Sequence, residues 1–183
     1  FLVQLARIIS VVIWLTMTVH GGTFPNVVLI TLDTMRADRM GFLGSQRGLT
    51  PTLDTLARQS VTFTRAFAQA PLTTPSHATI LTGTYPQFHK VNDFEVPLSK
   101  DLPYAPELFR QHGFSTAAFV GSIILDPSAR FAPGFDRGFD TYDAGFHRRL
   151  PREDRYSAIE RRADVVVSRA IGWINKHTNR PFF

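Results

Sequence analysis

A threonine hydroxyl stands at the start of a short predicted helix in Pro71-Leu-Thr-Thr-Pro-Ser-His-Ala-Thr-Ile-Leu-Thr-Gly83. Thr74 suits the N-cap of this helix, Pro75 its first position and Gly83 the left-handed position after its end. The free N–H groups of a helix N-terminus carry about half a unit of positive charge, which favours phosphate or sulfate. The pattern predicts an anionic-ester site beside Thr73, while a capped surface helix is the structural alternative.

A carboxylate follows the first predicted strand. Residues 26–33 read Asn-Val-Val-Leu-Ile-Thr-Leu-Asp, an apolar and β-branched run typical of a buried parallel strand that ends at Asp33. Ligands of open α/β sheets bind off the carboxyl ends of strands. A helix over 51–59 and a strand over 61–67 are predicted next. The chain thus runs through strand, acidic residue, helix and strand to the hydroxyl and its helix.

This order of elements and the sequence motifs within it resemble the amino-terminal half of the sulfatase branch of the alkaline phosphatase superfamily. The resemblance covers residues 24–183 and includes Pro-Asn-Val-Val-Leu-Ile-Thr-Leu-Asp at 25–33, Thr-Pro-Thr-Leu-Asp-Thr-Leu-Ala at 50–57 and Leu-Thr-Gly-Thr-Tyr-Pro at 81–86. It implies an α/β fold, an alkaline-phosphatase-like three-layer sandwich. Helices would flank a mainly parallel mixed sheet that is incomplete at the carboxyl end.

The resemblance also implies roles for single residues. The sulfatase signature is Cys or Ser, any residue, Pro, Ser, Arg, and residues 73–77 read Thr-Thr-Pro-Ser-His. Formylglycine cannot form, because the chain has no cysteine and threonine carries a methyl group where the aldehyde would arise. Threonine is the nucleophile in other branches of the superfamily, so Thr73 is expected to be nucleophile and metal ligand. Asp33 resembles the first metal-binding aspartate, and Thr34 replaces the second.

Three further positions follow from the same comparison. His77 takes the place of the sulfatase arginine, where a neutral imidazole would orient Thr73 or hold an oxyanion. Ser76 is expected to bind substrate. His89 belongs to a Tyr-Pro-x-x-His motif and is expected either to bind substrate or to order its loop. The sulfate-binding lysine and histidine of the family have no counterpart in Phe-Val-Gly-Ser at 119–122.

The expected function is metal-dependent hydrolysis of sulfuric or phosphoric esters with a threonine nucleophile. The alternatives are a phosphoethanolamine-type transferase and an inactive anion-binding domain. Oxygen ligands suit calcium or magnesium, and histidines would add manganese or zinc. The resemblance implies that further metal ligands lie in a carboxyl-terminal half. Expected ligands are small anionic esters, or sulfated or phosphorylated glycans or lipids.

The two ends of the sequence support predictions about export and about the extent of the chain. Arg7 precedes an apolar run over 8–19, typical of a signal peptide, with an uncleaved membrane anchor as the alternative. Residues 24–183 would then form an exported domain that is periplasmic, membrane-anchored or secreted. The chain begins without Met and ends in Pro-Phe-Phe, which is typical of a starting strand. We expect a piece of a longer protein that is poorly stable and inactive by itself.

The remaining segments are typical of the helices, strands and loops of an α/β scaffold. A helix over 105–112, a strand over 115–121, a turn-rich loop over 126–147 and an amphipathic helix over 157–176 are expected. The net charge of +5 draws on a basic cluster around the last loop. Because acidic residues alternate with these arginines, we expect a solvated face and no nucleic-acid partner. The cluster comprises Arg148, Arg149, Arg152, Arg155, Arg161 and Arg162.

Overall fold

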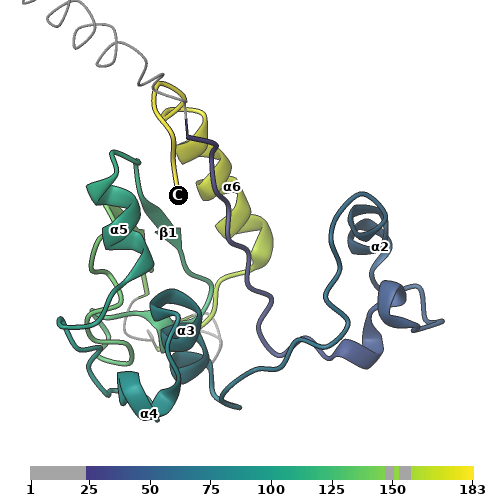
Figure 1. Ribbon diagram of the computed structural model, residues 1–183, viewed down its shortest axis with the longest axis horizontal. Helices are drawn as coiled ribbons and strands as arrows, with labels where there is room; N and C mark the ends of the chain where they lie inside the picture. Colours follow the sequence, from purple (N-terminus) through teal and green to yellow (C-terminus); the bar gives the residue numbers. More distant parts are fainter. Residues whose placement is uncertain (1–23, 147–150, 153–157) are drawn as a thin grey trace, which may run out of the picture.

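The computed structural model describes residues 24–146, 151–152 and 158–183 (Figure 1). The predicted signal peptide or anchor over 1–23 lies outside the described residues, as do Arg148, Arg149 and Arg155 of the basic cluster. Among the helices of the described part, none combines the length and the apolar character that a membrane crossing needs.

A small parallel sheet lies at the centre of the fold. Strand β1 (Ala117–Phe119) pairs in parallel with β2 (Thr141–Asp143), with Ala117 opposite Thr141. On the other side of β1, Phe182 forms a parallel bridge with Ser115. The N–H of Val27 donates to the carbonyl of Phe182 at 2.8 Å. The expected strand start at 181–183 therefore lies between residue 27 and β1.

Helices cover both faces of this sheet. Helix α6 (Ala163–Ile174) packs on β1 through Trp173, whose ring meets Phe119 edge-on at 6.3 Å. On the other side, Phe109 of α5 (Ala105–Gln111) stacks on Phe183 at 4.3 Å. Figure 1 shows α6 on one side of β1 and α5 on the other. Helices thus flank a parallel sheet, as the alkaline-phosphatase-like sandwich requires.

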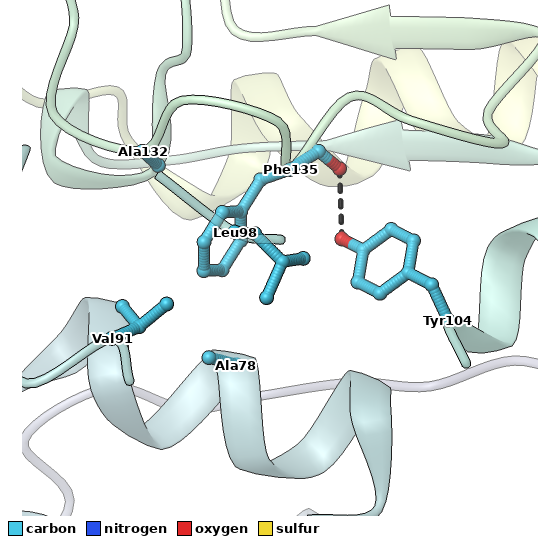
Figure 2. Packing of buried hydrophobic residues seen from close by; sticks show 6 residues of the cluster. All are labelled: Ala78, Val91, Leu98, Tyr104, Ala132 and Phe135. Atoms are coloured by element: carbon cyan, nitrogen blue, oxygen red, sulfur yellow. Dashed lines mark hydrogen bonds between the residues drawn. The ribbon is translucent and has the colours of Figure 1, made fainter. Parts of the chain in front are cut away.

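The apolar core lies beside helix α3 (Thr73–Thr82). Figure 2 shows Tyr104 donating its hydroxyl hydrogen to the carbonyl of Phe135 at 2.8 Å across this core. Helix α4 (Pro86–His89) and the 3₁₀ turn η3 (Ile123–Leu125) also contact α3. The core therefore holds α3 at a fixed place in the fold. Its buried members are Ala78, Val91, Leu98, Tyr104, Ala132 and Phe135.

Helix α2 (Pro51–Ala57) stands apart from the sheet together with the 3₁₀ turns η1 (Ala37–Arg39) and η2 (Gly41–Leu43) (Figure 1). Within the described residues η2 contacts both α2 and η1, and none of the three contacts another helix or strand. Asp54 joins α2 to η2, since its Oδ1 accepts the N–H of Phe42 at 2.8 Å. Local hydrogen bonds rather than an apolar core hold this unit.

Several predicted elements differ from the structure. Residues 61–67 form no strand and are exposed, and of residues 26–33 only Val27 pairs through its backbone with another segment that the structure describes. A strand needs a neighbour for its N–H and C=O groups, and neither segment meets one along its length. The predicted loop 126–147 contains β2, which is too short for a recognisable alternation. The helix predicted over 157–176 is shorter and spans Ala163–Ile174.

Candidate functional site

Helix α3 begins two residues earlier than its sequence predicts. Leu72 is the N-cap with φ −122° and ψ 145°, so that Thr73 is the first helical residue. The predicted N-cap, Thr74, is fully buried and donates its hydroxyl hydrogen to the carbonyl of Ile124 at 3.1 Å. The Thr74 hydroxyl is thus engaged by Ile124 and does not cap the helix. Gly83 does end the helix in the left-handed conformation, at φ 67°.

The structure brings Thr73 and Asp33 together across 40 residues of sequence. The Thr73 hydroxyl donates to Oδ2 of Asp33 at 3.0 Å. The other carboxylate oxygen, Oδ1, accepts the N–H of Thr34 at 2.9 Å. Thr34 has φ 56°, which a β-branched residue adopts only under strain. The turn after residue 33 therefore fixes the carboxylate that meets the hydroxyl of α3.

His77 lies on the same face of α3 and joins this group. Its Nδ1 is 2.8 Å from the carbonyl oxygen of Thr73, and its Nε2 is 3.0 Å from Oγ1 of Thr31. A carbonyl only accepts, so Nδ1 carries the proton. In the neutral ring Nε2 then accepts the hydroxyl hydrogen of Thr31. Sequence reasoning missed Thr31, although its position two residues before Asp33 was a usable signal.

The two other predicted site residues differ in their surroundings. Ser76 is half-buried in the first turn of α3, where its N–H donates to Leu72 at 3.0 Å. His89 is 1% exposed, and its Nδ1 accepts the N–H of Val91 while its Nε2 lies 3.0 Å from Oγ1 of Thr79. Burial lowers the pKa of His89. These bonds correspond to the loop-ordering alternative for His89.

The donor atoms at this site fit part of a site for a hard divalent cation. Asp33 offers a carboxylate and Thr73 a hydroxyl within 3.0 Å of each other, and such ions bind oxygen ligands. Across residues 24–146, 151–152 and 158–183, no three His, Cys, Asp or Glu side chains gather around a possible ion. Asp33 and Thr73 would therefore supply two ligands of a set that the described residues do not complete.

Comparisons with known proteins agree with this fold. The family model described as Sulfatase matches residues 25–183. The chain belongs to the sulfatase family. An ulvan-active sulfatase of Formosa agariphila is 39% identical to this sulfatase-family chain over 127 residues, covering 67% of the chain and 24% of the relative. An N-acetylglucosamine-6-O-sulfatase of Bacteroides thetaiotaomicron is 27% identical over 167 residues, covering 86% and 29%.

Structural comparison leads to the same superfamily. The crystal structure of a phosphonate monoester hydrolase of Agrobacterium radiobacter superposes with a TM-score of 0.57 and 25% sequence identity. The match covers 85% of this chain and 30% of the hydrolase. The sulfatase-like branch of the alkaline phosphatase superfamily, expected from the sequence, is thus confirmed. The chain spans between about a quarter and a third of these relatives' lengths.

Proposed function

We propose that the complete protein hydrolyses a sulfuric or phosphoric ester and that Thr73 is its nucleophile. One observation carries the proposal, the 3.0 Å hydrogen bond from the Thr73 hydroxyl to Oδ2 of Asp33. This bond brings a hydroxyl oxygen at the first residue of a helix against a carboxylate. The sulfatase relatives and the phosphonate monoester hydrolase support ester hydrolysis as the reaction class.

The chain's own groups support covalent catalysis. Oγ1 of Thr73 attacks sulfur or phosphorus while its proton passes to Asp33, and the bond from sulfur or phosphorus to the ester oxygen breaks. The leaving oxygen takes a proton from solvent, and water then cleaves the threonyl ester. The N–H groups of Thr73 and Thr74 lie at the start of α3 and have no acceptor within the helix. They are therefore suited to bind the non-bridging oxygens of the ester.

A divalent cation is part of the proposal. Asp33 and Thr73 would hold it together with ligands from the rest of the complete protein. When bound, it would polarise the ester oxygen and lower the pKa of the hydroxyl. Calcium or magnesium suits these oxygen donors.

We propose a sulfated or phosphorylated small molecule, glycan or lipid as the substrate. The relatives' names include an ulvan-active sulfatase and an N-acetylglucosamine-6-O-sulfatase, which supports a glycan among these classes. A panel of aryl sulfate, phosphate monoester, phosphodiester and phosphonate substrates separates sulfur from phosphorus chemistry.

We also propose that the complete protein is exported.

The deciding experiment substitutes Thr73 in the complete protein. Thr73→Ala should lower kcat at least about a thousandfold, because the oxygen that forms the covalent bond is removed. Thr73→Ser keeps a hydroxyl and should retain measurable turnover. Thr52→Ala, an exposed threonine in the first turn of α2, is the matched control. Turnover by Thr73→Ala at the wild-type rate would show that the proposed mechanism is wrong.

One observation favours a second candidate, an anion-binding domain without activity. Thr34 stands where the resemblance expects a second carboxylate, and its side chain brings no negative charge to the site. If the purified complete protein binds sulfate or phosphate but holds no divalent metal and turns over no ester, this second candidate is correct.

A further inference from the structure

Two side-chain hydrogen bonds join the segment before Thr34 to helix α3. Thr31 meets His77, and Asp33 meets Thr73, each at 3.0 Å. Residues two apart in strand-like backbone point to the same side about 6.6 Å apart, and residues four apart on a helix share a face with a rise of about 6 Å. The spacings match, so the two pairs form the rungs of one ladder.

This ladder is what fixes residues 28–33 in the described structure. Val27 is held by its backbone bond to Phe182. Beyond it, the residues that the structure describes make no hydrogen bond to 28–33 from elsewhere in the chain except the two rungs and the Thr34 N–H. Ile30 is 74% exposed, so apolar packing contributes little. The position of Asp33 against Thr73 therefore depends on the rungs themselves.

We propose that Thr31 and His77 are positioning residues that keep Asp33 and Thr73 in register. The proposal rests on the proposed function and deepens it. His77 is not the base for Thr73, because its Nδ1 proton lies on the Thr73 carbonyl and its Nε2 lone pair is taken by Thr31. The hydroxyl of Thr73 has its own acceptor in Asp33. His77 thus acts through Thr31 on the geometry of the site.

Two other histidines show which half of the His77 arrangement is specific. His112 and His177 also place Nδ1 2.8 Å from the carbonyl four residues earlier, on Leu108 and Trp173. This local bond to the carbonyl four residues earlier therefore recurs in the chain, at histidines that follow the ends of α5 and α6. The bond from Thr31 to Nε2 spans 46 residues and distinguishes His77. His112, exposed at the end of α5, provides the matched control.

The test measures kinetics of the complete protein. Thr31→Val removes the hydroxyl at nearly constant volume and should lower kcat roughly ten- to a hundredfold with little change in KM, because the reacting groups lose alignment. Thr31→Ser should restore most of the lost rate. His112→Ala should match the wild type. Thr31→Val combined with His77→Ala should lose no more than His77→Ala alone, since both break one rung.

A second readout does not depend on activity. Nitrogen NMR of the His77 ring should show the Nδ1–H tautomer in the wild type, a displaced Nε2 resonance in Thr31→Val and recovery in Thr31→Ser. Wild-type kcat and unchanged His77 resonances in Thr31→Val would overturn the proposal, as would a kcat loss that Thr31→Ser does not restore. If the wild type turns over no ester but the NMR changes are present, the proposed function is refuted. The hydrogen bond between Thr31 and His77 is then still confirmed.

Discussion

His77 and His89 differ in their surroundings, because their ring nitrogens meet different partners. His77 is half-buried and bonds a carbonyl on its own helix and the hydroxyl of Thr31. His89 is buried, and both of its nitrogens are satisfied by the loop and helix around it. A motif match does not distinguish the two cases. At the scale of single residues, the hydrogen-bond partners distinguish a histidine beside the candidate site from one that orders its loop.

Burial of His89 should make stability depend on pH. Its pKa is lowered below the ordinary value of about 6.5 because burial disfavours the charged ring. The unfolded chain therefore binds the proton more readily, and the stabilisation is complete above about pH 6.5 and is lost as the pH falls towards the folded pKa.

Urea unfolding of the complete protein across this range measures the effect. His89→Gln removes the titrating group, so its unfolding free energy should change less between neutral and mildly acidic pH than that of the wild type. His112→Gln, at an exposed histidine, should keep the wild-type slope. Equal slopes in His89→Gln and wild type would contradict the assignment.

Helix α3 carries Thr73, the proposed nucleophile, and the surroundings of the helix set how precisely it is held. Thr74 bonds to η3 and Ala78 lies in the core, so one face of the helix is buried against other elements. The loop that supplies Phe135 to this core continues to Gly138, which packs against the backbone of α5. Close backbone contacts of this kind leave little room for adjustment.

Two glycine substitutions should separate the cost of a left-handed backbone conformation from the cost of a steric clash. Gly138 has φ 80°, and a Cβ there would lie 2.7 Å from Cα of Glu107. Gly83 has φ 67°, with no atom within 4 Å of its Cβ position. Gly138→Ala should cost about 3 kcal/mol and Gly83→Ala about 1 kcal/mol, measured by urea unfolding. Equal costs would show that the contact with α5 is not tight.

At the scale of the whole molecule, the described chain leaves apolar segments in solvent. Val61, Phe63 and Phe67 are 82%, 78% and 78% exposed, and Ile30 is similar. Both segments were predicted as strands from their apolar and β-branched residues. Exposed apolar segments with unpaired backbone groups promote association between chains.

The 183-residue chain should therefore self-associate when it is produced alone. Phe63→Ser with Phe67→Ser removes two exposed rings and should shift sedimentation towards the monomer and lower the binding of an apolar dye. Thr62→Ser with Thr64→Ser is the control in the same segment and should behave as the wild-type chain. A monomeric wild-type chain with low dye binding would contradict this expectation.

The sequence by itself determined the local features of this protein. It predicted helix α3 and its end at Gly83, since glycine tolerates the left-handed conformation found there. It predicted a strand start at 181–183, where Phe182 forms a bridge, and it predicted the family, because motif spacing can be read directly from the sequence. It placed the N-cap at Thr74 wrongly, since the carbonyl of Ile124 that accepts the Thr74 hydroxyl lies 50 residues away in the sequence.

Only the tertiary structure decided which side chains meet. The bond from Thr31 to His77 and that from Asp33 to Thr73 join segments about 40 residues apart, and neither follows from local propensity. The segment 61–67 shows the converse case, because its strand-like residues form a strand only where a neighbour offers hydrogen bonds. Residue types fix what chemistry is available, whereas long-range packing fixes which groups come within hydrogen-bonding distance.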